Sequence, residues 1–163
     1  MKTAPNVRKK DSLSLSGESL TEIMRAVLAQ GKPFRFRATG LSMSPFIKDG
    51  DVVTVRPLRS RPPRTGDIAA FLYPGTGKVA VHRIVREKSG RYSLKGDNVP
   101  AVDGSLPLDR ILGTVSRVDR DGAKVSLGGR VGAAAIASLS RSGLLSKAVG
   151  AARRAGLRKS GRS

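Results

Sequence analysis

The sequence contains no cysteine and no tryptophan, and only one of its 163 residues, His82, is a histidine. Without cysteine the chain has no thiolate nucleophile, no cysteine-ligated zinc or iron–sulfur site and no disulfide framework. A single imidazole also excludes a site built from several histidine ligands. Aromatic residues make up only 4% of the chain, too few for a platform on which single-stranded bases stack. We therefore expect no metal and no cofactor, and chemistry based on hydroxyl, imidazole, carboxylate and amine groups.

Long apolar runs are also lacking. A secretory signal has a basic start followed directly by an apolar run, whereas residues 1–10 are followed by the polar stretch 11–18. The most apolar window, residues 131–139, is too short and too rich in Gly, Ala and Ser to span a bilayer of about 30 Å. We expect no transmembrane segment and no signal peptide, and a protein that is cytoplasmic or attached to a membrane only at its surface.

Acidic residues are scarce: 12 of them face 31 lysines and arginines, for a formal net charge of +19. Much of the excess lies at the ends, since residues 128–163 hold eight basic residues and no acid, and residues 1–10 add four more. Basic ends attract polyanions without distinguishing between them, and they also occur as plain solvated tails. An anionic membrane surface is the partner we expect for the C-terminal tail, and nucleic acid is the less favoured alternative.

Composition divides the chain into three zones. Residues 1–15 are basic and then serine-rich, and we expect them to be disordered. Residues 16–127 form the predicted globular domain, a β domain with a leading helix. Residues 128–163 form a basic, Gly- and Ala-rich tail with a weak amphipathic pattern. Because each glycine costs a helix about 1 kcal/mol relative to alanine, the tail would become helical only on a surface such as lipid.

The leading helix is predicted over residues 19–30. Ser19 and Glu22 have the spacing of a capping box, and Gly31 followed by Pro33 provides the stop. One face is apolar, and we expect it to pack on the core. This stripe consists of Leu20, Ile23, Met24, Val27 and Leu28.

The pattern then changes to short β-prone segments separated by turn residues. No helical pattern of 10–15 residues lies between them, so the fold is predicted to be mainly β and not a doubly wound sheet. Residues 119–122, Asp-Arg-Asp-Gly, are typical of a hairpin turn. The predicted strands are residues 34–38, 51–56, 68–73, 79–85, 92–94, 111–118 and 124–127.

Ser42 is the candidate nucleophile. It lies shortly after a predicted strand, with Gly40 before it and Met43 and Pro45 after it. A nucleophilic serine needs a sharp, exposed turn, so that its oxygen faces a cleft and its own amide faces an oxyanion. A serine between glycine and proline is more often a plain turn residue, so this segment alone does not identify Ser42 as a nucleophile.

His82 lies within an apolar strand, where alternation places it on one face with Ala80 and Ile84. A buried, hydrogen-bonded histidine is the ordinary interpretation, and a general base for Ser42 is the alternative. Two carboxylates, Asp97 and Asp103, follow in one loop. Either acid could orient the imidazole, and either could equally be a turn residue.

Taken in order, these segments resemble the type I signal peptidase family over about residues 37–118. The usual bacterial members have a lysine at the position of His82. A histidine at this position is similar to the archaeal and endoplasmic-reticulum branch. The matching segments are Ser-Met-x-Pro at 42–45, Gly-Asp-x-Val at 50–53, Gly-Asp-Ile-x-x-Phe at 66–71, Val-His-Arg-Ile-Val at 81–85, Lys-Gly-Asp-Asn at 95–98 and Asp-Gly at 103–104.

The resemblance implies a coiled, partly open β-barrel, shared with LexA-like repressors, and a serine endopeptidase that cleaves a leader or precursor peptide by acyl transfer. Ser42 would be the nucleophile, His82 the base and Asp103 the acid that orients the ring. Supporting roles would fall to Asp97, Gly40 and Met43. Members normally carry a membrane anchor, which is not seen here. Many also have a serine, with a hydroxyl that helps to bind the oxyanion, at the position of Gly40.

Two other functions stay open. A LexA-like regulator would cut itself once with a Ser–Lys pair, although neither Lys78 nor Lys95 falls at that family's lysine position. A non-catalytic adaptor would bind nucleic acid or lipid through its basic ends, on a peptidase-like core that has no activity. The oligomeric state is not indicated by the sequence.

Overall fold

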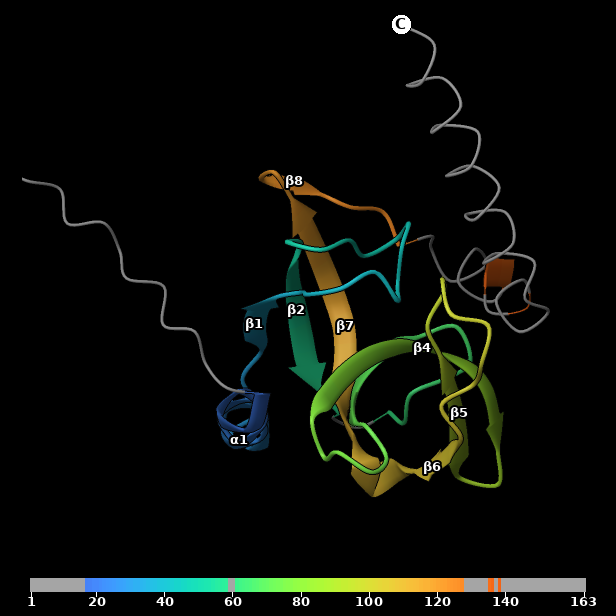
Figure 1. Ribbon diagram of the computed structural model, residues 1–163. Coiled ribbons are helices and arrows are strands. Elements are labelled where there is room, and N and C mark those ends of the chain that lie inside the picture. Colours follow the sequence, from blue (N-terminus) through green and yellow to red (C-terminus); the bar gives the residue numbers. More distant parts are fainter. Residues whose placement is uncertain (1–16, 59–60, 128–134, 137, 139–163) are drawn as a thin grey trace, which may run out of the picture.

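The computed structural model describes residues 17–58, 61–127, 135, 136 and 138 (Figure 1). Within these residues one helix accompanies an eight-stranded antiparallel sheet, in which the strand order is β1-β2-β7-β3-β4-β5-β6 and β8 pairs with β7. The mainly β fold class is thereby confirmed, as an open sheet. The predicted disordered segment 1–15 lies outside the described residues, as does nearly all of the predicted helical tail 128–163.

Most predicted strands match the structure to within a few residues. The short strand β6 (Ser105–Pro107) was missed, because three residues that include a proline give no periodic signal. The elements are α1 (Gly17–Ala29), β1 (Phe34–Arg37), β2 (Val52–Pro57), β3 (Ile68–Leu72), β4 (Val79–Lys88), β5 (Arg91–Lys95), β6 (Ser105–Pro107), the 3-10 turn η1 (Leu108–Arg110), β7 (Ile111–Arg120) and β8 (Ala123–Lys124).

The helix α1 begins at Gly17, so the predicted start at Ser19 was wrong by two residues and Ser19 lies inside the first turn. The predicted end is confirmed: Gly31 has a φ of 74° and its N–H donates to the carbonyl of Leu28 at 2.9 Å. Met24 and Leu28 are buried against the sheet. No helix in the described ranges has the length and apolarity needed to cross a membrane.

The core has two apolar clusters. The first joins α1 to β1, β2 and β7 and includes Met43 and Ile47 from the β1–β2 connection. The second lies around Phe71 and Ile84, between β3, β4 and β5. Alternate residues of β4 serve different clusters, since Val79 and Val81 pack against the first and Ala80 against the second. The β1–β2 connection is therefore held by packing on its inner side.

Strand β4 changes partners along its length. Its residues from Val79 to Arg83 pair with β3, and those from Arg83 to Lys88 pair with β5. The register shifts between Ile84 and Arg86, as at a β-bulge, and β4 is strongly curved (Figure 1). Among the described strands, the segment before Arg83 pairs only with β3, and β1 pairs only with β2. Each of these two segments therefore has one edge available for another strand.

Candidate active site

Ser42 lies in the connection between β1 and β2, and this connection is fixed at both ends. Gly40 has a φ of 88°, a conformation that favours glycine, and its N–H donates to Asp49 Oδ1 at 2.8 Å. Beyond the serine, the N–H of Ile47 donates to the carbonyl of Met43 at 3.0 Å. Because the Met43 side chain is also buried, the serine is carried on a rigid turn and not on a free loop.

His82 lies opposite this turn on β4, and the structure places its ring between the serine and an acid. Its Nε2 lies 3.0 Å from Ser42 Oγ, and its Nδ1 lies 2.5 Å from Asp103 Oδ2. The side chains of His82 and Asp103 are only 9% and 6% exposed. The Phe71 ring, 5.7 Å away between centroids, packs against the imidazole and limits its movement.

This arrangement sets the tautomer of a neutral imidazole. An ionised carboxylate can only accept a hydrogen bond, so Nδ1 carries the proton that faces Asp103. Nε2 is then left with a lone pair directed at the Ser42 hydroxyl. Such an imidazole can take the serine proton as general base, and the carboxylate stabilises the imidazolium that forms.

Asp103 belongs to the loop between β5 and β6. Its N–H donates to the carbonyl of Leu94 at 2.9 Å, which ties the acid to the end of β5. Gly104 follows with a φ of 104°, so the chain turns sharply directly after the acid. Leu94 is itself fully buried in the second core cluster, and the position of the carboxylate therefore depends on the core.

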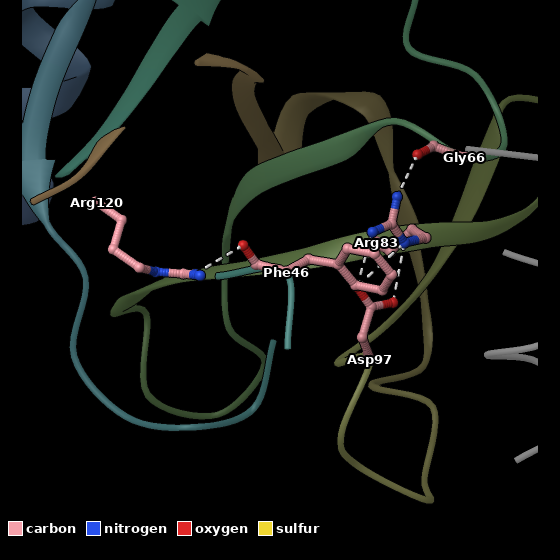
Figure 2. Close-up of polar contacts among 5 residues, drawn as sticks. All are labelled: Phe46, Gly66, Arg83, Asp97 and Arg120. Atoms are coloured by element: carbon pink, nitrogen blue, oxygen red, sulfur yellow. Dashed lines mark hydrogen bonds and ion pairs between the residues drawn. The ribbon is translucent and has the colours of Figure 1, made fainter. Parts of the chain in front are cut away.

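Asp97, the other candidate acid, binds Arg83 instead of the imidazole (Figure 2). The guanidinium donates from Nε to Oδ1 at 2.9 Å and from Nη2 to Oδ2 at 2.8 Å, and both side chains are almost completely buried. Nη1 also donates to the carbonyl of Gly66 at 3.0 Å, and the Phe46 ring centroid lies 5.2 Å from the guanidinium carbon. Asp97 thus holds the strand residue after His82 in place.

Phe46 also connects to a second ion pair. Arg120 donates to both oxygens of Asp51 at 2.8 and 2.7 Å. Its Nη2 also donates to the Phe46 carbonyl oxygen at 3.4 Å (Figure 2). Hydrogen bonds from Arg120 hold the pKa of Asp51 below its ordinary value of 3.8, against the opposing effect of burial. The turn that carries Ser42 is therefore braced by one arginine on β4 and by another at the end of β7.

The segment before Asp97 passes close to the serine and the imidazole. A Cβ atom at Gly96 would lie 2.7 Å from the Ser42 carbonyl oxygen and 3.2 Å from His82 Nε2. Only glycine fits such an approach without displacing its neighbours. Lys95, next to it, is 1% exposed, and burial lowers the pKa of its amine while the nearby Asp97 carboxylate opposes that shift.

A groove of about 770 Å³ opens at Ser42 and His82. It lies between the two available strand edges, with Phe36 and Arg37 of β1 on one side and β4 residues on the other. Its floor and walls are largely apolar. The remaining lining residues are Gly17, Leu20, Ala38, Thr39, Gly40, Met43, Ile47, Val79, Ala80 and Val81.

The structure brings together Ser42, His82 and Asp103, which are far apart in the sequence. Gly40 and Met43 line the groove and shape the turn, and Asp97 supports β4 through Arg83. Arg83 was not among the residues predicted for the site. A signal existed, since an arginine in the middle of a Val- and Ile-rich strand must find an acid if it is buried.

Comparison with known protein families identifies the family of the domain that carries this site. A match to the Peptidase S24-like family spans residues 9–115, which is more than half of the chain. The chain belongs to this family. The Peptidase S24-like family lies in the LexA and signal peptidase I superfamily, and it supports a serine-peptidase-like or LexA-like self-cleaving fold. No curated protein matches the chain. The resemblance is thereby confirmed at the level of this superfamily, and the signal peptidase branch with its Ser-His form stays a prediction.

Proposed function

We propose that this Peptidase S24-like protein is a serine endopeptidase of the Ser-His form, which cleaves a leader or precursor peptide with Ser42, His82 and Asp103. The observation that carries the proposal is the pair of contacts at the imidazole, 3.0 Å to Ser42 Oγ and 2.5 Å to Asp103 Oδ2. Buried histidines commonly bind one or two polar groups. Here the partner at Nε2 is a hydroxyl that also opens onto a groove.

The reaction is acyl transfer in two steps. Ser42 Oγ attacks the peptide carbonyl while His82 Nε2 takes the hydroxyl proton, and the Ser42 N–H donates to the oxyanion of the tetrahedral intermediate. The imidazolium then protonates the leaving amine as the C–N bond breaks. A water molecule attacks the acyl-serine with the same base, which releases the carboxylate product and restores the hydroxyl.

The groove suits a substrate in extended conformation. A peptide strand placed between β1 and the first half of β4 would hydrogen-bond to both available edges, and its alternate side chains would enter the groove. Met43, Ile47, Val79 and Val81 make the pocket beside Ser42 apolar. We expect small or aliphatic side chains next to the cleaved bond, because those match such walls.

The test is digestion of a pooled library of peptides by the full-length protein, with mass spectrometry of the products. The wild type should yield cuts that follow apolar residues, and Ser42→Ala should yield none. Ser116→Ala is the matched control. Ser116 lies on an exposed part of β7, far from Ser42 in the sequence, and its Oγ donates to the Thr54 carbonyl. Equal cleavage by the wild type and Ser42→Ala would overturn the proposal.

Self-cleavage is the second candidate, and one observation favours it. Gly17 and Leu20 line the groove, so the chain enters α1 beside the candidate nucleophile. Incubation of the purified protein at several concentrations should then produce a loss of mass at a rate independent of concentration, which Ser42→Ala prevents. A constant mass over days would exclude this candidate and leave cleavage of other chains.

A further inference from the structure

Asn98 makes two hydrogen bonds to successive carbonyl groups of the turn that carries Ser42. Its backbone N–H donates to the Ser42 carbonyl at 2.7 Å, and its side-chain Nδ2 donates to the Leu41 carbonyl at 3.1 Å. The two carbonyls belong to the peptide units directly before and directly after the Cα of the serine. One residue of the β5–β6 loop therefore contacts both peptide planes that flank the nucleophile, and the Ser44 N–H also donates to the Leu41 carbonyl at 3.1 Å.

Holding the carbonyls also orients the amides. A trans peptide unit is planar, and its N–H points opposite to its C=O. Because the Leu41 and Ser42 carbonyls face Asn98, the N–H groups of Ser42 and Met43 face away from it. Neither of these N–H groups donates to a backbone acceptor in the described part of the chain. Two preorganised, uncommitted donors beside a nucleophile are what an oxyanion requires.

We infer that Asn98 is a positioning residue, which fixes the Ser42 amide and hydroxyl for attack and for binding of the oxyanion. The inference rests on the proposed function. Gly40, two residues before the nucleophile, has no hydroxyl to donate to an oxyanion, so this stabilisation falls to the backbone donors.

Asn98 is itself held rigidly, which a positioning residue requires. The preceding residue, Asp97, is buried and bound to Arg83 by three hydrogen bonds. Gly96 lies so close to the Ser42 carbonyl that no side chain fits between them. The N–H of Val99 donates to the Gly96 carbonyl at 3.1 Å and closes the loop. A shift of the Asn98 backbone would therefore disturb a buried ion pair.

The experiment measures the rate at which an alkyl fluorophosphonate labels the full-length protein. Phosphonylation of a serine displaces fluoride and builds negative charge on the phosphoryl oxygen, so the rate reports both the hydroxyl and the oxyanion donors. Asn98→Ala and the isosteric Asn98→Asp remove the Nδ2 donor but keep the backbone N–H. We expect labelling to slow by about 10- to 100-fold in both variants, and in the uncharged Asn98→Ala without a shift of the pH midpoint.

Controls separate this role from a structural one. Ser116→Ala loses a comparable exposed side-chain bond to a carbonyl, and it should label at the wild-type rate. Melting temperatures of the Asn98 variants should stay within a few degrees of the wild type. If both Asn98 variants label as fast as the wild type, or only their pH midpoint shifts, the inference is wrong while the proposed function stands. If the wild type labels no faster than Ser42→Ala, the proposed function fails, and the inference fails with it.

Discussion

Asp103 Oδ2 lies 2.5 Å from His82 Nδ1, at the nitrogen opposite the one that faces Ser42. The contact joins the loop after β5 to the middle of β4 and fixes the ring at both nitrogens. Asp103→Asn preserves the shape of the side chain but presents an amide that favours the wrong tautomer. We expect kcat to fall by about 10²- to 10⁴-fold, with little change in KM.

The same change at an exposed carboxylate provides the control for this variant. Asp109→Asn alters η1, which is exposed and lies outside the groove, and should leave kcat unchanged. The kcat values of the two variants and the wild type would be compared by steady-state kinetics on a peptide that the library digestion identifies as a substrate. A wild-type kcat for Asp103→Asn would show that the carboxylate has no part in catalysis.

The tautomer can be observed directly, because the chain has a single histidine. Nitrogen-15 NMR of the neutral imidazole should show a protonated Nδ1 and an unprotonated Nε2 in the wild type. In Asp103→Asn the tautomer populations should shift toward a protonated Nε2. A wild-type spectrum in which Nε2 carries the proton would contradict the assignment of His82 as a base for Ser42.

The buried pair Arg83–Asp97 should dominate local stability. Asp97→Ala leaves a guanidinium buried without its partner, and we expect the free energy of unfolding to fall by about 3–5 kcal/mol in urea denaturation. Arg117→Ala breaks a pair with Asp119 in which the arginine side chain is 53% exposed, and it should cost at most about 1 kcal/mol. Equal losses for the two variants would show that the buried pair is not a special support of β4.

Gly96→Ala tests the close approach of the β5–β6 loop. The added Cβ would lie 2.7 Å from the Ser42 carbonyl oxygen, so the loop or the turn must move. We expect activity to fall by at least about tenfold and stability to fall by about 1–3 kcal/mol. Gly75→Ala makes the same substitution in a turn with open space and a φ of 83°, so it should cost stability through backbone strain alone and leave kcat intact. A fully active Gly96→Ala would contradict the close approach of Gly96 to the Ser42 carbonyl.

Acid should weaken the pair Asp51–Arg120. Because the folded pKa of Asp51 lies below 3.8, the stabilisation is complete well above that pH and is lost as the pH falls through the folded pKa. The difference in melting temperature between the wild type and Asp51→Asn should be constant near neutral pH and should shrink below about pH 4. For Asp109→Asn the difference should stay small throughout. A difference in melting temperature between the wild type and Asp51→Asn that widens in acid would contradict the lowered pKa of Asp51.

The sequence was sufficient to predict every described strand except β6, because the signals of the other strands are local. The turn at Asp121 and Gly122 is an example, since both residues have positive φ values of 50° and 80° and join β7 to β8 directly. The start of α1 was harder. Ser19 and Glu22 have capping-box spacing, yet the helix continues two residues further toward the N-terminus, where Gly17 lies against the Lys78 side chain. A contact between segments remote in sequence leaves no local signal from which the start of the helix could be read.

The candidate site could be predicted as a set of residues, with Asp97, Gly40 and Met43 as supports, but the contacts that hold these residues in place could not. Ser42 and His82 stand out by residue type and by the resemblance of their surrounding segments. Which acid faces the imidazole depends on the path of the loop between β5 and β6, and no periodic pattern encodes that path. The roles of Arg83 and Asn98 depend on distances between segments that are remote in sequence. These distances are fixed by the pairing of β4 with β5.

The most direct test of the account is to find the residue that an alkyl fluorophosphonate modifies. Full-length protein is labelled, digested and mapped by mass spectrometry, with His82→Ala and Ser116→Ala treated in parallel. The account predicts one adduct, on Ser42, formed at the same rate in Ser116→Ala and at least about a hundredfold more slowly in His82→Ala. An adduct on another serine, or equal labelling of Ser42 without the imidazole, would contradict it.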